Sequence, residues 1–167
     1  MFYYFPAMNG IVVPVIDTLK LANEYAPNVV AVKFTDAKYS DARLISDAGF
    51  NVCVGAAEVF NSALASGAHG LIGTMNNWSG SLHGKIYSSF QEPRTRHLAD
   101  RYAAHSCVMA KAIEQTGNVF SGRAYMFEKV SGFNLGAYRY PLHNLDDAHR
   151  KKLDEFIAGF DLDPTFE

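Results

Sequence analysis

Short apolar runs alternate with amphipathic stretches through the first half of the chain. Four runs rich in β-branched and aromatic residues predict strands, at residues 2–5, 29–35, 50–55 and 69–74. They show no clean alternation of polar and apolar residues, which is typical of parallel strands covered on both faces. Helical stretches between the strands favour parallel βαβ units over hairpins.

Residues at helical spacing fill the intervals between these strands. Asn9 and Gly10 predict a turn after the first strand. The predicted helices are a stretch from Val12 to Ala22 with Pro14 in its first turn, residues 40–49, and a face made by Phe60, Ala63, Leu64 and Gly67.

Strand signals end after the fourth strand, and helical periodicity takes over. One helix has an apolar face over residues 99–113, another covers 121–131, and the last covers 145–160 with acidic residues in its first turn. The sequence therefore predicts an α/β fold in one domain, with βα units in residues 1–77 and helices in residues 78–167. Four strands are too few to close a (β/α)8 barrel, which needs about 250 residues.

Composition narrows the class of protein. A net charge of −2 and a pI near 6.3 give no electrostatic reason to expect binding to nucleic acid or to an anionic membrane. No apolar run reaches the ~18 residues of a membrane span, and the apolar N-terminus lacks the basic region of a secretory signal. We expect a soluble cytoplasmic protein. Its two cysteines, Cys53 and Cys107, are expected to be buried and inert, and no spacing indicates a metal site.

One lysine interrupts the apolar run of residues 29–35. On a strand, Lys33 shares a face with Ala31 and Thr35 and lies near the carboxyl end, where parallel sheets bind ligands. Burial penalises a charged amine, and a neutral amine attacks carbonyl carbon to form a Schiff base. The alternative is an ordinary lysine at a strand end, which packs its stem and extends its charge to water.

Residues at the ends of the neighbouring strands favour ligand binding. Gly55 and Glu58 follow the third strand, and Thr74 ends the fourth. Tyr3 or Tyr4, at the end of the first strand, offers a phenol for proton transfer. The simpler interpretations are a helix start for Glu58 and plain packing for the tyrosines.

Five segments together resemble the pyruvate-dependent class I aldolases and lyases, the superfamily of N-acetylneuraminate lyase and dihydrodipicolinate synthase. They are YYFPAMNG (3–10), VAVKFTD (30–36), VGAAE (54–58), GAHGLIGTMNN (67–77) and RYPL (139–142). The resemblance runs over essentially the whole chain. It implies the C-terminal half of a (β/α)8 TIM barrel, with the last barrel helix and C-terminal helices in residues 78–167.

The resemblance also implies roles for single residues. Lys33 corresponds to the lysine that forms an imine with pyruvate, and Tyr3 to the tyrosine that moves a proton during cleavage or formation of the carbon–carbon bond. The positions that line the pocket for pyruvate or its aldehyde partner are Thr35, Gly55, Ala57, Glu58, Ile72 and Thr74. Chemistry of this kind needs no metal or organic cofactor.

Departures from the family pattern bear on the substrate. The arginine that dihydrodipicolinate synthases carry two positions after the proline is Met8 here, and an aspartate of sialate lyases is Ala57. The resemblance is closer to the lyase branch, which implies an N-acetylneuraminate lyase-like reaction of pyruvate and an aldehyde. A dihydrodipicolinate synthase-like enzyme and an aldolase for another 2-keto-3-deoxy sugar acid are the alternatives.

The family's barrel begins long before the tyrosine strand, in a part whose GxxGE-type loop holds the pyruvate carboxylate. A half barrel exposes an open core face and two unpaired strand edges, here near residues 1–5 and 69–74. We expect these edges to drive formation of a homo-oligomer or pairing with the missing N-terminal half, and we expect the chain alone to be a poor catalyst. A non-catalytic assembly or regulatory module is the alternative from another class of function.

Overall fold

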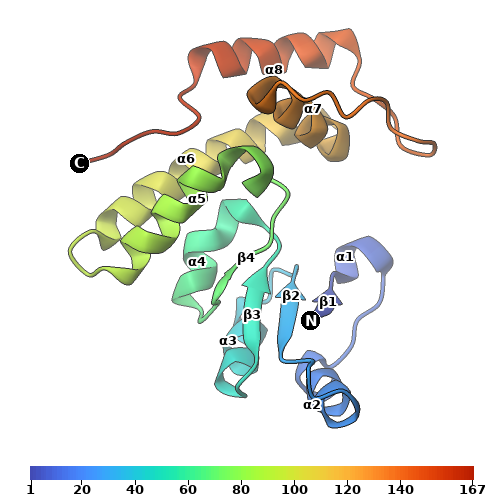
Figure 1. The fold of residues 1–167 in the computed structure, drawn as a ribbon, viewed down its shortest axis with the longest axis vertical. Helices are drawn as coiled ribbons and strands as arrows, with labels where there is room; N and C mark the ends of the chain where they lie inside the picture. Colours follow the sequence, from blue (N-terminus) through green and yellow to red (C-terminus); the bar gives the residue numbers. More distant parts are fainter. The chain divides into compact units, whose positions relative to one another are not determined.

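The computed structural model describes residues 1–167, which form two compact units, Met1–Gly73 and Thr74–Glu167 (Figure 1). All the strands belong to the first unit, and the second unit is entirely helical. The predicted change from βα units to helices is therefore seen in the structure.

The four predicted strands form one parallel sheet in the order β1-β2-β3-β4 (Figure 1). Their bounds are Phe2–Tyr4, Ala31–Phe34, Asn51–Val54 and Gly70–Leu71. The last strand is shorter than predicted, but its ladder extends on both sides. The N–H of His69 donates to Val52 at 2.7 Å, and that of Ile72 donates to Val54 at 2.9 Å. The α/β fold with four parallel strands is confirmed.

Short helices join the strands of the first unit. They are α1 (Pro6–Asn9), α2 (Val15–Tyr25), α3 (Tyr39–Asp47), the 3-10 turn η1 (Ala57–Val59) and α4 (Phe60–Ala65). The predicted turn at Asn9 and Gly10 is the end of α1, where Gly10 takes a φ of 71° that favours glycine. The three predicted helices are confirmed to within a few residues.

The two faces of the sheet are buried unequally. Val32, Phe34, Val52 and Val54 point to one face and are almost fully buried. On β3, Asn51 and Cys53 alternate with these residues and point to the other face. Asn51 is exposed and Cys53 is half-buried. The expectation that both faces are covered is therefore met on the first face only. The second face is more open, as expected of a half barrel, although Ala31 on that face is buried.

Four helices make up the second unit: α5 (Asn76–Gln91), α6 (Arg96–Glu114), α7 (Val119–Ser131) and α8 (Asp147–Gly159). The last three match the predicted helices. Asn118 and Asp146 cap α7 and α8, because their side chains accept the N–H of Ser121 and His149. The sequence pattern gave no bounds for α5, which contains two glycines and is kinked at Ser79.

The predicted apolar face of α6 is confirmed, since Ala99, Tyr102, Met109 and Ile113 are buried. Cys107 lies on another side of the helix and is exposed, so the expectation of a buried thiol is wrong there.

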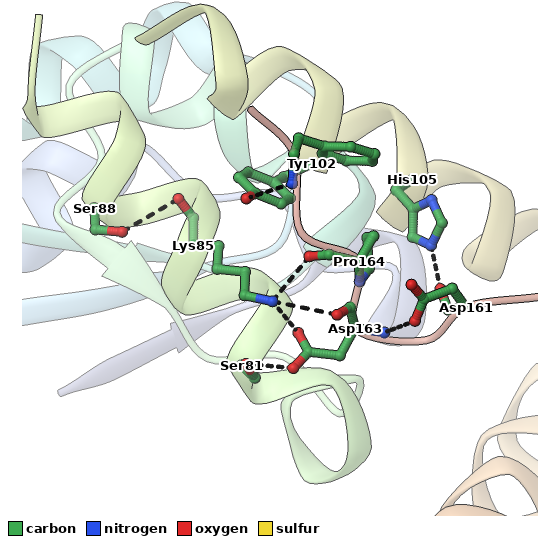
Figure 2. A network of polar contacts seen from close by, with 9 residues as sticks. Ser81, Lys85, Ser88, Tyr102, His105, Asp161, Asp163 and Pro164 are labelled. Atoms are coloured by element: carbon green, nitrogen blue, oxygen red, sulfur yellow. Dashed lines mark hydrogen bonds and ion pairs between the residues drawn. The ribbon is translucent and has the colours of Figure 1, made fainter. Parts of the chain in front are cut away.

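The C-terminal segment, residues 161–167, is held by polar contacts with α5 and α6 (Figure 2). Lys85 Nζ donates to the carboxylate of Asp163 and to the carbonyl of Pro164, each at 2.8 Å. Ser81 donates to the same carboxylate at 2.9 Å. The hydrogen bond from Lys85 lowers the pKa of Asp163 below its usual range. This segment is thus an ordered part of the second unit.

His83 is a buried titratable group between α5 and α6. Its side chain is 4% exposed, with Nδ1 2.7 Å from Asn76 Oδ1 and Nε2 3.0 Å from Ser106 Oγ. A neutral ring satisfies both contacts, because Nδ1–H donates to the amide oxygen and Nε2 accepts from the hydroxyl. Burial lowers the pKa of His83 from 6.5 to about 4.

We therefore expect His83 to make folding sensitive to mild acid. Its neutral form contributes full stability above pH 6.5, and this contribution is lost as the pH falls toward 4, because only the unfolded chain binds the proton in that interval. Between pH 7 and pH 5 the loss should be about 2 kcal/mol. Urea unfolding of the wild type and of His83→Gln at both pH values measures it. The exposed His97→Gln variant serves as the control, and a wild-type pH dependence in His83→Gln would contradict the assignment.

Candidate functional site

Parallel pairing places three chemically useful side chains in one row across the sheet. Tyr3 of β1 lies opposite Lys33 of β2, which lies opposite Cys53 of β3. Residues in register on neighbouring strands point to the same face, so the three side chains share the more open face of the sheet. The sequence had put Tyr3 and Lys33 at strand ends, and the register brings them together.

Lys33 contacts an aromatic ring and has no acidic partner. Its Nζ lies 4.2 Å from the centroid of the Tyr3 ring. The residue is half-buried, and no carboxylate forms an ion pair with it. An amine without a salt bridge has no electrostatic partner to lose when it reacts with a carbonyl compound.

Tyr3 and Tyr4 face opposite sides of the sheet. Tyr4 is 6% exposed and stacks on Phe34 with ring centroids 5.6 Å apart, so it packs in the core. Tyr3 is 50% exposed on the side of Lys33. Of the two tyrosines, Tyr3 is thus the one whose ring lies beside Lys33.

Three of the predicted pocket residues form a second row, just beyond the strand ends. The N–H groups of Thr35, Gly55 and Ile72 each donate to the neighbouring strand, at 2.9, 3.0 and 2.9 Å. These bonds continue the parallel ladder and hold the three residues side by side at the carboxyl edge of the sheet. This edge is where parallel sheets bind their ligands.

Thr35 and Gly55 approach each other closely within this row. A Cβ atom at Gly55 would lie 2.0 Å from Thr35 Oγ1, so only glycine fits. The Thr35 hydroxyl is buried and has no hydrogen-bond partner in the structure. A buried hydroxyl that forms no hydrogen bond costs free energy.

The remaining predicted residues are placed differently from one another. Ala57 is 3% exposed and points into the protein, whereas Glu58 is half-buried in η1 and Ile72 is 40% exposed. Thr74 is exposed and begins the second unit. Ala57 therefore offers no polar atom to a substrate.

Tyr39 and Cys53 are two residues near this edge that sequence reasoning did not select. The pKa of the Tyr39 phenol is raised by burial first and then by the charges of Glu58 and Asp36, which places both carboxylates within electrostatic reach of the ring. Burial also raises the pKa of the Cys53 thiol. The alternation along β3 could have indicated Cys53, but only the strand register puts it beside Lys33.

The structure contains neither a cluster of metal-binding side chains nor a membrane-spanning helix. No group of three or more histidine, cysteine, aspartate or glutamate side chains is arranged to hold a metal ion. None of the helices combines the length and apolar character that crossing a membrane requires.

Comparison with known proteins gives consistent matches over nearly the whole chain. A sequence model of the dihydrodipicolinate synthetase family matches residues 1–159. The chain is 32% identical to N-acetylneuraminate lyase of Xenopus tropicalis over 151 residues, and 28% identical to that of Gallus gallus over 161 residues. These alignments cover 86% and 94% of this chain and 47% and 50% of the relatives, so the chain spans about half their length.

Solved structures show the same fold. N-acetylneuraminate lyase of Proteus mirabilis superposes with a TM-score of 0.79 at 22% identity, over 93% of this chain and 53% of that one. Dihydrodipicolinate synthase of Cyanidioschyzon merolae gives a TM-score of 0.80 at 21% identity, and the match covers 93% of this chain and 52% of that one. The chain thus matches about half of each of these structures, which agrees with the expected partial barrel.

Proposed function

Since the chain belongs to the dihydrodipicolinate synthetase family, we propose that Lys33 forms a Schiff base with the keto carbon of pyruvate. The observation that carries the proposal is the position of this amine. It lies on the open face of a parallel sheet, 4.2 Å from the ring of Tyr3 and without an ion pair. Curated relatives over most of the chain carry the name N-acetylneuraminate lyase, which supports a carbon–carbon lyase.

The proposed reaction begins with attack of the Lys33 nitrogen on the keto carbon of a 4-hydroxy-2-keto acid. The Tyr3 phenol gives its proton to the departing hydroxyl, and loss of water leaves the protonated imine and the Tyr3 phenolate. The bond between the third and fourth carbons then breaks, its electron pair moves toward the imine nitrogen, and the proton of the 4-hydroxyl passes to the Tyr3 phenolate. The aldehyde leaves, the Tyr3 phenol protonates the enamine at the third carbon, and water releases pyruvate and free Lys33.

Thr35, Gly55 and Ile72 are proposed to position the keto acid. Their backbones form the row beyond the strand ends, and the Thr35 hydroxyl is a buried group without a partner. Gly55 leaves the space that this hydroxyl occupies. Glu58, in the turn after β3, is proposed to accept hydrogen bonds from hydroxyl groups of the aldehyde partner.

Within this chemistry we favour an N-acetylneuraminate lyase-like cleavage of a 2-keto-3-deoxy sugar acid. Ala57 is buried and apolar, so it supplies no contact to a long polyol chain. A shorter sugar acid therefore fits the site better than N-acetylneuraminate itself. A dihydrodipicolinate synthase-like reaction is the less favoured candidate, because Met8 cannot bind a second carboxylate.

We also propose that another polypeptide segment completes the site, either in a second copy of this chain or in an N-terminal half-barrel. β1 and β4 are edge strands, each paired on one side only. An unpaired parallel edge favours association with a further strand. The chain covers about half the length of its relatives, so the other half of those proteins has no counterpart in this sequence.

Reductive trapping tests the imine. Incubation with pyruvate and borohydride should attach the reduced keto acid to Lys33, and peptide mass analysis should locate it there. Lys33→Arg should give no adduct, because a guanidinium does not form the imine. The nearby exposed Lys38→Arg variant should react like the wild type.

Trapping also separates the enzyme from a non-catalytic module. An adduct yield that rises with protein concentration would indicate a site completed by association. No adduct at any concentration, or an equal adduct on several lysines, would contradict the proposed function.

A further inference from the structure

A cavity of the second unit lies between α7, α8 and the loop that joins these helices. Its volume is about 210 Å3, and its lining residues are Glu128, Asn134, Gly136, Ala137, Asn144 and Arg150. A smaller cavity of about 40 Å3 adjoins it and shares four of these residues. None of the residues proposed for the imine chemistry contributes to either wall.

The wall carries one acid and one base that do not pair with each other. Glu128 of α7 and Arg150 of α8 both line the cavity, yet no ion pair joins them. The next residue of α7, Lys129, does pair directly with Asp154 of α8, at 2.9 Å. The two helices are thus close enough for ion pairs, and the separation of Glu128 from Arg150 is a local feature of the cavity.

Other contacts hold the two charged groups apart. Arg150 Nε donates to the carbonyl of Leu145 at 3.1 Å, and the guanidinium lies 5.8 Å from the ring centroid of Tyr125. Glu128 Oε1 accepts a hydrogen bond from the side-chain amide of Asn134 at 3.0 Å. Leu145, Tyr125 and Asn134 themselves line the two cavities, so these contacts place both charged groups at the wall.

Both charged groups keep hydrogen-bonding capacity for a ligand. The terminal nitrogens of Arg150 and the second oxygen of Glu128 make no hydrogen bond within the chain. The amide nitrogen of Asn144 is also uncommitted, because only its oxygen is used, by the N–H of Tyr138 at 3.0 Å. Guanidinium and amide N–H groups suit a carboxylate, whereas the carboxylate of Glu128 suits an ammonium group.

The opposite signs of the two groups select the kind of ligand. A simple anion that approaches Arg150 is repelled by Glu128, and a simple amine that approaches Glu128 is repelled by Arg150. A zwitterion presents a charge of the right sign to each group. The adjoining small cavity is lined in part by Ala124 and Leu145, which leaves room for a short apolar side chain.

We propose that this cavity binds a small zwitterionic α-amino acid, with its carboxylate on Arg150 and its ammonium group on Glu128. Asn144 adds a donor to the carboxylate, and Leu145 contacts the short side chain. The site lies within the second unit and involves neither Lys33 nor a keto group of the ligand. It therefore goes beyond the proposed imine chemistry and stands or falls independently of it.

L-Alanine and two singly charged analogues test the need for both charges. Saturation-transfer NMR of the ligand methyl signal should show saturable binding of L-alanine at millimolar concentration. L-Alaninamide lacks the carboxylate and N-acetyl-L-alanine lacks the ammonium group, so each should bind about tenfold or more weakly. Absence of saturable L-alanine binding would overturn the proposal, as would equal binding of either analogue.

Variants test the role of each charged group. Glu128→Gln should weaken L-alanine binding by about tenfold or more, and it should narrow the gap to N-acetyl-L-alanine because the repulsion is removed. Arg150→Met should weaken L-alanine binding by a similar factor, and Arg150→Lys should weaken it less, because it keeps the charge and loses the fork of donors.

Two control variants should bind L-alanine like the wild type. Lys152→Met removes an exposed charge from the opposite side of α8, and Lys33→Arg removes the proposed imine amine. Loss of L-alanine binding in Lys33→Arg would place the amino acid at the sheet and refute the assignment. Unchanged affinity in folded Glu128→Gln or Arg150→Met would also refute it. If Arg150→Met does not fold, unchanged affinity in both Arg150→Lys and Glu128→Gln would do so.

Discussion

Tyr3→Phe should slow the exchange of the methyl protons of pyruvate with D2O by about 10²–10⁴-fold, while Lys33 still forms the trapped imine. Exchange requires the imine to lose a methyl proton and become an enamine, which is the step assigned to the Tyr3 hydroxyl. Phenylalanine keeps the ring whose face lies 4.2 Å from Lys33 Nζ, so the environment of the amine is preserved. Proton NMR of pyruvate follows the exchange, and borohydride trapping follows the imine.

Tyr4→Phe is the matched control for this experiment. Tyr4 is the adjacent tyrosine on the same strand, but its ring stacks on Phe34 in the core and faces away from Lys33. We expect this variant to exchange pyruvate protons at the wild-type rate. Wild-type exchange in Tyr3→Phe would exclude the phenol as the proton carrier. Loss of both exchange and trapping in Tyr3→Phe would indicate that Tyr3 only shapes the site.

Gly55→Ala should destabilise the protein by about 3 kcal/mol, the upper part of the usual range for overpacking a filled space. The new methyl group would lie 2.0 Å from Thr35 Oγ1 and 3.0 Å from both Thr35 Cβ and Cγ2. Threonine is branched at Cβ, so rotating its side chain cannot clear all three contacts. Urea unfolding followed by circular dichroism measures the loss, and trapping at Lys33 should fall with it.

A double-mutant cycle identifies the cause of this loss. Thr35→Ala alone should change stability by less than about 1 kcal/mol, because the deleted hydroxyl has no partner. Thr35→Ala combined with Gly55→Ala should recover at least about 1 kcal/mol, since the two sites are in contact. Gly84→Ala, in the open face of α5, should stabilise by about 0.5–1 kcal/mol. Additive effects of the two substitutions would show that the contact is not responsible.

Much of the first unit could be predicted because its signals are local. A run such as residues 29–35 is apolar and β-branched, and side-chain alternation along it puts Lys33 with Ala31 and Thr35 whatever surrounds the strand. The apolar face of α6 follows from helical spacing in the same way. The roles proposed for single residues came from the resemblance to a family, because no local pattern gives them. The match of the family's sequence model over residues 1–159 shows that family.

The kinked start of α5 shows where local signals fail. Glycine and serine are weak helix formers, and the first turn keeps its shape partly because Ser79 Oγ donates to the carbonyl of Met75. The buried His83 also gave no sequence signal, because its partners are the distant Ser106 and the amide of Asn76.

The sequence by itself determined the four strands, most of the helices and the face of the sheet that carries Lys33, because these depend on the period of side chains along a few neighbouring residues. Only the tertiary structure decided that Tyr3 and not Tyr4 meets that lysine, that Thr35 fills the space left by Gly55, and that Glu128 shares a cavity with Arg150. Those pairs are separated by 20 or more residues of chain, and their contacts are set by strand register and helix packing, which no local pattern encodes.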